Sequence, residues 1–159
     1  MNGASMSFAE WLRARVFRAT QRPSEVTGSD ARDRAGRTPL MNAVIDGDLA
    51  RTRDLLARGA NPDDVDRAGW CALHFAAQEH SVEAVRMLVG AGAALELRDR
   101  HGNTPLWRAV LASKGRGEVI ALLLEAGADP DAANASGHSP RGMARTIANY
   151  EIEGFFAGY

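Results

Sequence analysis

The sequence predicts an all-α solenoid of stacked helix pairs, and two observations support this fold class. The phrase Asp-Arg-x-Gly recurs every 33 residues, beginning at Asp33, Asp66 and Asp99. The phrase Thr-Pro-Leu keeps the same register at 38–40 and 104–106. A fixed period of this length indicates structural repeats, each of which buries its apolar face against its neighbours.

Length, composition and charge limit the class of protein. With 159 residues and 45% hydrophobic residues, the chain can bury one core. It lacks both an apolar run of roughly 18 residues and a signal-peptide pattern, so we expect a soluble cytoplasmic protein without a membrane span. Cys71 is the single cysteine, which suits a reducing compartment. A net charge of −1 argues against nucleic acid as the main partner.

The N-terminal segment is expected to precede the repeats. Residues 1–7 are predicted to be disordered, 8–20 to form a helix with capping-box spacing, and 21–32 to form a linker. The polar side of the helix carries three arginines. This helix would cap the apolar end of the first repeat, bind a partner or lie on a membrane surface, and these alternatives stay open.

Repeat one (33–65) is predicted to contain a first helix near 38–46 and a second helix near 48–57. The Thr38 side chain can cap the first helix, and the proline that follows presets its first turn. The second helix is unusually polar, so this unit is expected to be the weaker half of the stack.

Repeat two (66–98) has Cys71 and Ala72 in place of Thr-Pro, so the threonine cap is expected to be lost. His74 lies in the repeat without a nucleophile or a set of metal ligands nearby in sequence. We therefore expect His74 to be structural. Its position resembles that of the signature histidine of ankyrin repeats, and this resemblance implies that it ties the loop to neighbouring backbone.

Repeat three (99–133) begins like repeat one but contains two extra residues in the loop 113–117. Two glycines make this loop flexible and its lysine and arginine make it basic. The second helix is expected at 118–125. The insertion is either neutral, since surface loops tolerate changes in length, or a contact for a partner.

Repeat four (134–157) is predicted to be a truncated capping repeat. Apolar residues mark a first helix up to Ile147, Asn149 is expected to break it, and 152–156 are expected to form a short second helix. Arg141 stands where the other repeats have leucine, which suits an outer face.

The residues that usually perform catalysis or bind metals do not form a recognisable set. The four histidines lie in different repeats, and Cys71 has no cysteine partner. The sequence Gly115-Arg116-Gly117 lacks the strand and the Gly-Lys-Ser/Thr ending of a phosphate loop. We therefore expect no enzymatic activity, no cofactor and no metal site.

A protein partner is expected to bind the concave surface formed by hairpin tips and first helices. An arginine follows the leading aspartate of each full repeat, giving a ladder with a spacing of roughly 10 Å that either contacts the partner or pairs with the adjacent aspartates. Trp70 and Phe75 are expected to be exposed aromatic contacts, although Trp70 could instead pack over Pro39 or Pro105. The predicted contact residues are Arg34, Arg37, Ile45, Asp46, Arg67, Trp70, Phe75, Gln78, Glu79, Arg100, Asn103, Arg108 and Leu111.

Several phrases together resemble ankyrin repeats, and in particular a group of small bacterial ankyrin-repeat proteins. They are Gly36–Gly47, Leu73–Glu79, Asn103–Val110 with its glycine insertion, and Thr146–Tyr150 before two phenylalanines. Members of this group often occur near polymorphic toxin genes. The resemblance implies an immunity-type inhibitor that binds a cognate toxin. The alternative is an intracellular scaffold or adaptor recruited through the arginine-rich N-terminal helix. We expect the chain to be a monomer when unbound.

Overall fold

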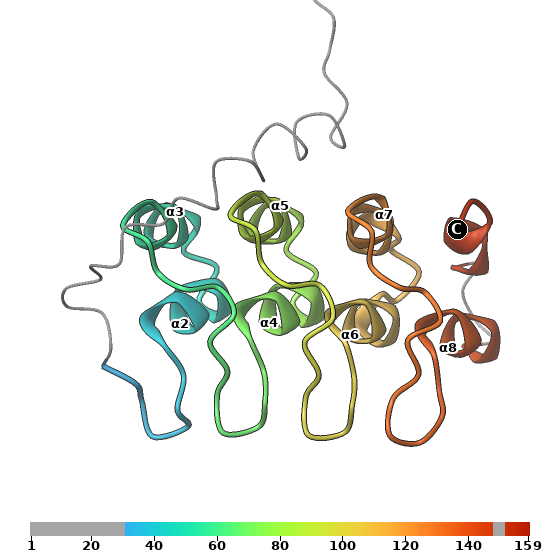
Figure 1. Cartoon of the computed structure of the whole chain (residues 1–159). Helices are drawn as coiled ribbons and strands as arrows, with labels where there is room; N and C mark the ends of the chain where they lie inside the picture. Colours follow the sequence, from blue (N-terminus) through green and yellow to red (C-terminus); the bar gives the residue numbers. More distant parts are fainter. Residues whose placement is uncertain (1–30, 148–151) are drawn as a thin grey trace, which may run out of the picture.

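The computed structural model describes residues 31–147 and 152–159, which form a stack of helix pairs in two rows (Figure 1). The first helices of the pairs are α2 (Pro39–Ile45), α4 (Ala72–Gln78), α6 (Pro105–Ala112) and α8 (Pro140–Thr146). The second row contains α3 (Leu49–Ala57), α5 (Val82–Gly90), α7 (Glu118–Glu125) and the 3-10 helix η1 (Glu153–Phe156). No strand occurs within the described ranges.

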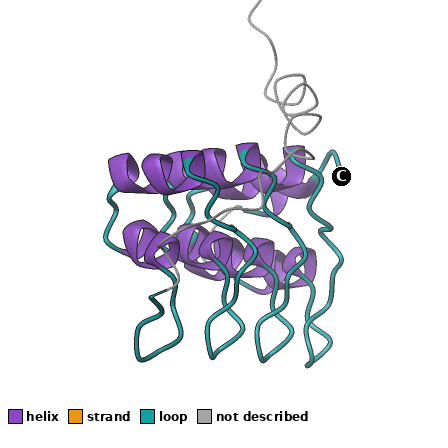
Figure 2. Cartoon of the chain, turned by 60° about the vertical axis from the view of Figure 1, so that its left-hand side comes forward, coloured by secondary structure: helices purple, strands orange, loops and turns teal. Residues whose placement is uncertain are grey.

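Long hairpin-shaped loops join each second helix to the next first helix. They project beyond the row of first helices, on the side away from the second helices (Figure 2). The hairpin tips and the first helices thus share a surface, which we call the inner face. Among the described helices, none is long and apolar enough to cross a membrane.

The all-helical solenoid is confirmed, and most expected helices lie within one residue of their observed bounds. The first pair was expected at 38–46 and 48–57, where α2 and α3 occur, and α7 has its expected bounds. Two expectations for the fourth unit need correction. Helix α8 ends at Thr146, because Ile147 has left the helical conformation with ψ of 83°. The short second helix is a 3-10 helix.

Several predictions concern residues that the structure does not describe. The residues expected to be disordered (1–7) and to form a helix (8–20) lie outside the described residues, as do nearly all of those expected to form a linker (21–32) and Asn149. They remain sequence-based expectations.

Hydroxyl side chains cap three of the first helices. Oγ1 of Thr38 and of Thr104 each accept a backbone N–H at 3.3 Å, and Oγ of Ser139 accepts one at 3.1 Å. Cys71 makes no such side-chain cap bond, as expected. Instead its own backbone N–H donates to Nδ1 of His74 at 3.2 Å, so the start of α4 is fixed from within the helix.

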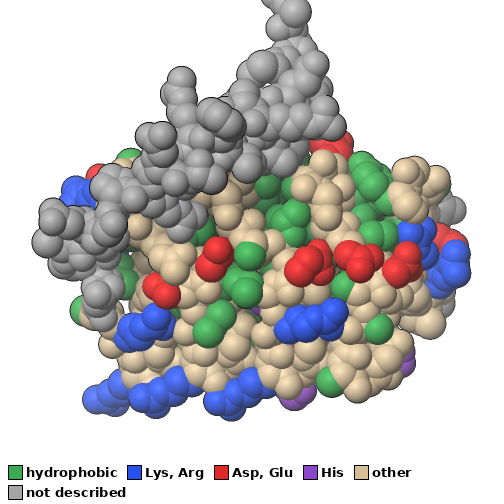
Figure 3. Space-filling view, viewed as in Figure 1, with side chains coloured by type: hydrophobic (Ala, Val, Ile, Leu, Met, Phe, Trp, Pro, Cys, Tyr) green, Lys and Arg blue, Asp and Glu red, His purple; other side chains and the backbone are tan. Residues whose placement is uncertain are grey.

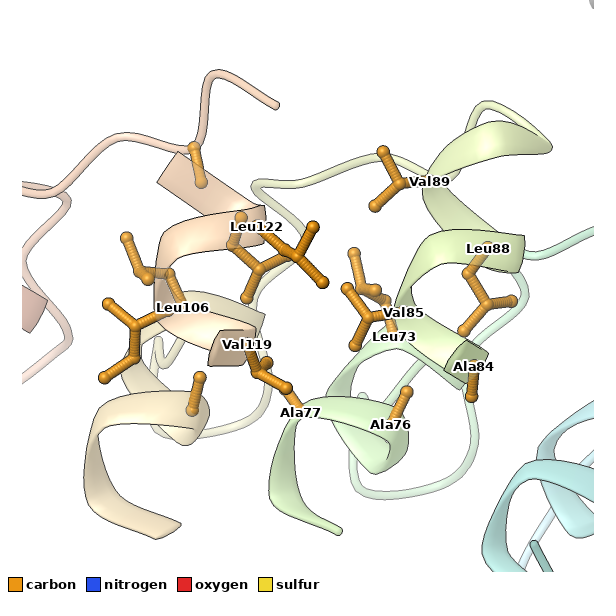
Figure 4. Packing of buried hydrophobic residues seen from close by; sticks show 14 of the residues in the cluster. Leu73, Ala76, Ala77, Ala84, Val85, Leu88, Val89, Leu106, Val119 and Leu122 are labelled. Atoms are coloured by element: carbon orange, nitrogen blue, oxygen red, sulfur yellow. The ribbon is translucent and has the colours of Figure 1, made fainter. Parts of the chain in front are cut away.

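One apolar core runs through the stack, and it is formed between pairs as much as within them. Figure 4 shows Leu73 and Val85 of the second pair facing Val119 and Leu122 of the third. All four are buried. Alanines at the crossings of α4 with α5 let the helices approach closely, and a core of this kind favours stacking over independent folding of single repeats.

Helix α3 is the polar exception within the second row. Thr52 is its fully buried residue, and its hydroxyl donates to the carbonyl of Asp48 at 2.8 Å. Leu49, Leu55 and Leu56 are only partly buried against the core. Helix α7, by contrast, buries five aliphatic residues, so the contrast in polarity expected from the sequence is present.

The glycine-rich loop before α7 packs against the C-terminal 3-10 helix η1. Gly117 is buried, and a Cβ placed there would lie within the ring of Phe155 in η1. The backbone of Gly117 has φ of −100°, which other residues also adopt, so the need for glycine is steric. The insertion therefore has a structural role that neither sequence-based alternative included.

Arg141 closes the C-terminal end in a second way. Its guanidinium pairs with Asp131 at 2.9 Å and donates to the carbonyls of Phe156 and Tyr159 at 3.3 and 2.8 Å. The side chain expected on a solvated outer face is thus half-buried and holds the last residues in place.

Gly117→Ala is expected to lower the free energy of unfolding by about 1–3 kcal/mol, since the added methyl overpacks against Phe155. Thermal or urea unfolding measures the change. Gly154→Ala is the matched control, because no atom lies within 4 Å of a Cβ at that position.

The double variant Gly117→Ala/Phe155→Ala tests the cause. Removal of the ring should make the added methyl nearly neutral when compared with Phe155→Ala alone. Equal costs of Gly117→Ala with and without the ring would contradict the steric explanation.

Candidate protein-binding surface

The leading aspartate of each repeat holds its hairpin turn together. In Asp33, Asp66 and Asp99, Oδ1 accepts two backbone N–H groups of the same turn at 2.8 to 3.0 Å. These bonds favour the charged carboxylate, and the bond from the N–H of Arg37 is the main cause that lowers the pKa of Asp33. The aspartates are therefore committed to the turn backbone.

The three ladder arginines, Arg34, Arg67 and Arg100, are exposed at the hairpin tips, and we call them the tip row. Across the described part of the chain, no carboxylate forms an ion pair with any of the three. The alternative that they pair with the adjacent aspartates is therefore wrong. Figure 3 shows basic side chains gathered along the edge of hairpin tips, separate from a row of acidic side chains.

Four side chains of the inner face stack on one another and link neighbouring repeats. The guanidinium of Arg37 lies over the ring of Phe75, 5.4 Å from its centroid. The ring of Phe75 lies 5.0 Å from that of Trp70, and the Arg108 guanidinium lies 4.3 Å from Trp70. We call these four residues the arginine–aromatic cluster. Contacts of this kind contribute roughly 0.5–2 kcal/mol each, depending on exposure.

This packing corrects the expected exposure of the aromatic side chains. Phe75 is 9% exposed, because Arg37 and Trp70 cover its ring. Trp70 is half-buried, and its ring contacts are with Phe75, His74 and Arg108. The expected full exposure of Trp70 is therefore wrong, and its packing over Pro39 or Pro105 stays a prediction.

Asp99 and Arg108 form a buried ion pair that fixes one end of the cluster. Asp99 is buried, with 6% of the residue exposed. Its carboxylate accepts hydrogen bonds from the Arg108 guanidinium and from the side-chain amide of Asn103. Burial alone would raise the pKa of Asp99, but these hydrogen bonds outweigh it and lower the pKa to about 2. Asp99 is therefore ionised at neutral pH, and it holds Arg108 over Trp70.

Asn103 was expected to contact a partner, but the structure buries it. Its side chain is 4% exposed, donates to Asp99 and accepts from the amide of Asn134 at 2.8 Å. The tip position that is arginine or tryptophan in the first two repeats is thus an internal bridge in the third.

The other predicted contact residues lie apart from the cluster. Asp46 and Glu79 are exposed at the ends of α2 and α4, and Leu111 of α6 is 46% exposed. Ile45 and Gln78 are half-buried, and Ile45 packs against the core.

His74 has the structural role expected of it. Its Nδ1 accepts the N–H of Cys71, so Nε2 carries the proton and donates to the carbonyl of Asn103 at 3.0 Å, in the next repeat. Burial lowers the pKa of His74 below 6.5, and burial likewise raises the pKa of the Cys71 thiol to about 11. Both groups are therefore neutral at neutral pH and suited to structure rather than chemistry.

Two inner-face residues were missed by sequence reasoning. Asp99 was considered only as one possible partner of the adjacent Arg100, and Trp107 was not proposed as a contact, although its ring lies 5.6 Å from the Arg108 guanidinium. A register signal existed: the residue nine positions after the leading aspartate is Asn42, Phe75 or Arg108. Asn42 also reaches Asp33, at 3.4 Å, as Arg108 reaches Asp99.

The arrangement offers binding contacts rather than reactive groups. Nowhere in 31–147 or 152–159 do three His, Cys, Asp or Glu side chains meet in a way that could hold a metal ion. The surface consists of guanidinium groups, aromatic rings and carboxylates committed to hydrogen bonds.

Comparison with known proteins places these features in a family. The family model "Ankyrin repeats (3 copies)" matches residues 22–99 and 40–134. The human "Ankyrin repeat and SOCS box protein 3" is 37% identical over 93 residues, which are 57% of this chain and 18% of that protein. The mouse "Protein phosphatase 1 regulatory subunit 27" is 35% identical over 113 residues, with 68% and 72% covered.

A solved bacterial structure is also similar. The crystal structure of an ankyrin repeat domain from Acinetobacter baumannii matches with a TM-score of 0.76 and 34% identity, covering 82% of this chain and 68% of that one. The chain spans less than a fifth of the human relative and of its bovine counterpart. Similarity to those two proteins therefore concerns their repeats.

The lowered pKa of His74 predicts a dependence of stability on pH. As the pH falls below 6.5, the unfolded chain takes up a proton at this histidine before the folded chain does. Stability from this group is therefore complete above the unfolded pKa and is lost as the pH falls, by at most about 1.4 kcal/mol per pH unit.

Urea unfolding between about pH 7.5 and about pH 5 measures this dependence. His74→Gln keeps the other three histidines, so its free energy of unfolding should fall less steeply than that of the natural chain. Parallel pH profiles would contradict the assignment.

Proposed function

The chain belongs to the ankyrin-repeat family, and we propose that it binds and inhibits one protein partner, a cognate toxin, by covering part of the toxin surface with its inner face. Ankyrin repeats are protein–protein interaction modules without catalytic activity. The toxin role extends this general function, and it draws on the resemblance to small bacterial ankyrin-repeat proteins. A bacterial structural neighbour with 34% identity is compatible with that resemblance.

The arginine–aromatic cluster is the observation that supports binding at the inner face. Tryptophan and arginine are enriched among residues that dominate binding energy, and both are present here in one packed unit. Stacking on neighbouring rings fixes the positions of Arg37, Trp70 and Arg108 before a partner arrives. Preorganisation of this kind lowers the entropic cost of association.

Two hydrogen-bond donors of the cluster are left without a protein acceptor. Nε of Arg37 and Nε of Arg108 are both shielded from solvent and have no hydrogen-bond partner within the described residues. A buried donor without an acceptor costs free energy, roughly 1–3 kcal/mol. An acceptor supplied by a bound partner would recover that energy only if the two side chains shifted to expose these donors.

The proposal requires that binding inhibits the activity of the toxin. The test is to identify a toxin gene beside the gene for this chain, to co-express the two proteins and to measure growth. We expect growth rescue and a complex of one molecule of each protein. Absence of rescue with both proteins present in soluble form would contradict the toxin role.

Trp70→Ala is expected to weaken that complex by about 2 kcal/mol or more, because it removes the central ring of the cluster. Isothermal titration calorimetry measures the affinity, and circular dichroism verifies that the variant is folded. Tyr159→Ala is the control, since Tyr159 is 52% exposed and lies at the C-terminal end of the stack, outside the cluster.

The same complex distinguishes an inhibitor from an adaptor. If deletion of residues 1–22 abolishes recruitment while Trp70→Ala has no effect, the partner is held by the N-terminal segment and the inner-face proposal is wrong.

A further inference from the structure

We propose that the tip row, Arg34, Arg67 and Arg100, binds an extended acidic segment of the protein partner. The inference rests on the proposed function only in that this chain binds a protein; it does not require that the partner be a toxin. It concerns the tips, whereas the arginine–aromatic cluster lies farther along the inner face.

The charge at the tips is directed outward. The arginine side chains are exposed. The neighbouring carboxylates of Asp33, Asp66 and Asp99 each accept N–H groups of their own turns, and they are exposed, half-buried and buried respectively. The charge of Asp99 is further matched by Arg108. A ligand at the edge therefore meets guanidinium groups first, as the basic side chains along the tips in Figure 3 show.

The arginines are held at a regular spacing by the backbone. The N–H of Arg67 donates to the carbonyl of Ala35 at 3.0 Å, and the N–H of Arg100 donates to the carbonyl of Ala68 at 3.1 Å. Adjacent turns are thus bonded to each other at the arginine itself. Gly102 has φ of +76°, and a Cβ there would lie 2.7 Å from the next turn, so the turns are also closely packed.

This spacing matches an extended polypeptide. Stacked repeats are separated by roughly 10 Å, the usual distance between packed helices. An extended chain in the polyproline II conformation rises about 3.1 Å per residue with three residues per turn, so every third side chain lies on the same side and falls opposite the next arginine. Carboxylates at such positions can each accept two parallel N–H bonds from one guanidinium.

The row has a defined end. In the fourth turn, Ala135 occupies the position of the ladder arginines, although its N–H makes the same bond to the preceding turn, at 2.9 Å. Three guanidinium groups therefore define the site, and a segment of about seven residues spans them.

An acidic protein segment fits this edge better than a nucleic acid does. Figure 3 shows a row of acidic side chains across the middle of this face, farther from the tips than the basic side chains. The loops after the second helices also carry exposed acidic residues, among them Glu96, Asp129 and Asp131. The chain has a net charge of −1. A polyphosphate wide enough to touch those loops would be repelled, whereas a single extended segment can remain on the tips.

The probe for the experiment is a fluorescein-labelled synthetic peptide of Gly, Ser and Glu, with glutamate at every third position. About ten residues suffice to span the row. Fluorescence anisotropy measures its affinity, and NMR signals of the arginine Nε–H groups locate it. The peptide with glutamine in place of glutamate and an oligothymidylate of the same charge serve as comparison ligands.

We expect Arg34→Gln/Arg67→Gln/Arg100→Gln to weaken binding about tenfold, since each exposed ion pair contributes a factor of about two. Raising the salt concentration should also weaken binding, because exposed charges are screened. The matched control is Arg51→Gln/Arg53→Gln/Lys114→Gln, which removes three exposed positive charges elsewhere and should change the affinity by less than about twofold.

Three results would each overturn the proposal. They are no binding of the acidic peptide to the natural chain, equal losses in the tip variant and the control, and binding of oligothymidylate as tight as that of the peptide. The last would assign the tip row to nucleic acid. None of these results affects growth rescue or the effect of Trp70→Ala, so failure here is distinguishable from failure of the proposed function.

Discussion

Burial of apolar side chains between adjacent helix pairs is the constraint on which the structure depends. A single pair cannot cover its own apolar face, so each unit is stable only against its neighbours. Leu73 and Val85 are fully buried because the third pair lies against the second. The hydrogen bond from His74 to the carbonyl of Asn103 crosses the same boundary and fixes the hairpins relative to the helices. Regular stacking therefore determines where every tip residue lies.

The inner face follows from this register. A tip residue of one repeat reaches a first-helix residue of the next, as Arg37 reaches Phe75 and Trp70 reaches Arg108. The cluster is thus a diagonal series of contacts across three repeats, and it contributes to stacking as well as presenting a surface. A partner bound there would contact side chains that already hold the repeats together, which couples binding to the stability of the stack.

The periodic sequence predicts the fold almost completely, because period, caps and apolar positions all specify backbone structure. Thr38 and Thr104 cap their helices as their spacing indicates, and His74 binds backbone of the next repeat. The site is less predictable, because exposure depends on neighbours one repeat away. Phe75 occupies an expected surface register and is buried beneath Arg37 and Trp70. The contact between Phe155 and Gly117 is not predictable in this way, because the repeat period does not specify which segments of the inserted loop and the C-terminal helix meet.

The residue at one position of the repeat differs between repeats, and this difference explains why the proposed binding surface covers only part of the stack. Four residues after the leading aspartate come Arg37, Trp70 and Asn103 in the three full repeats. A long side chain at this position reaches across to the next first helix and forms part of the inner face. The short amide of Asn103 bonds instead to Asp99 and Asn134 and becomes internal. The tip row likewise ends before Ala135. Both changes concentrate exposed guanidinium groups and the arginine–aromatic cluster on the first three repeats. The fourth, in which Arg141 bonds to the last residues, closes the stack.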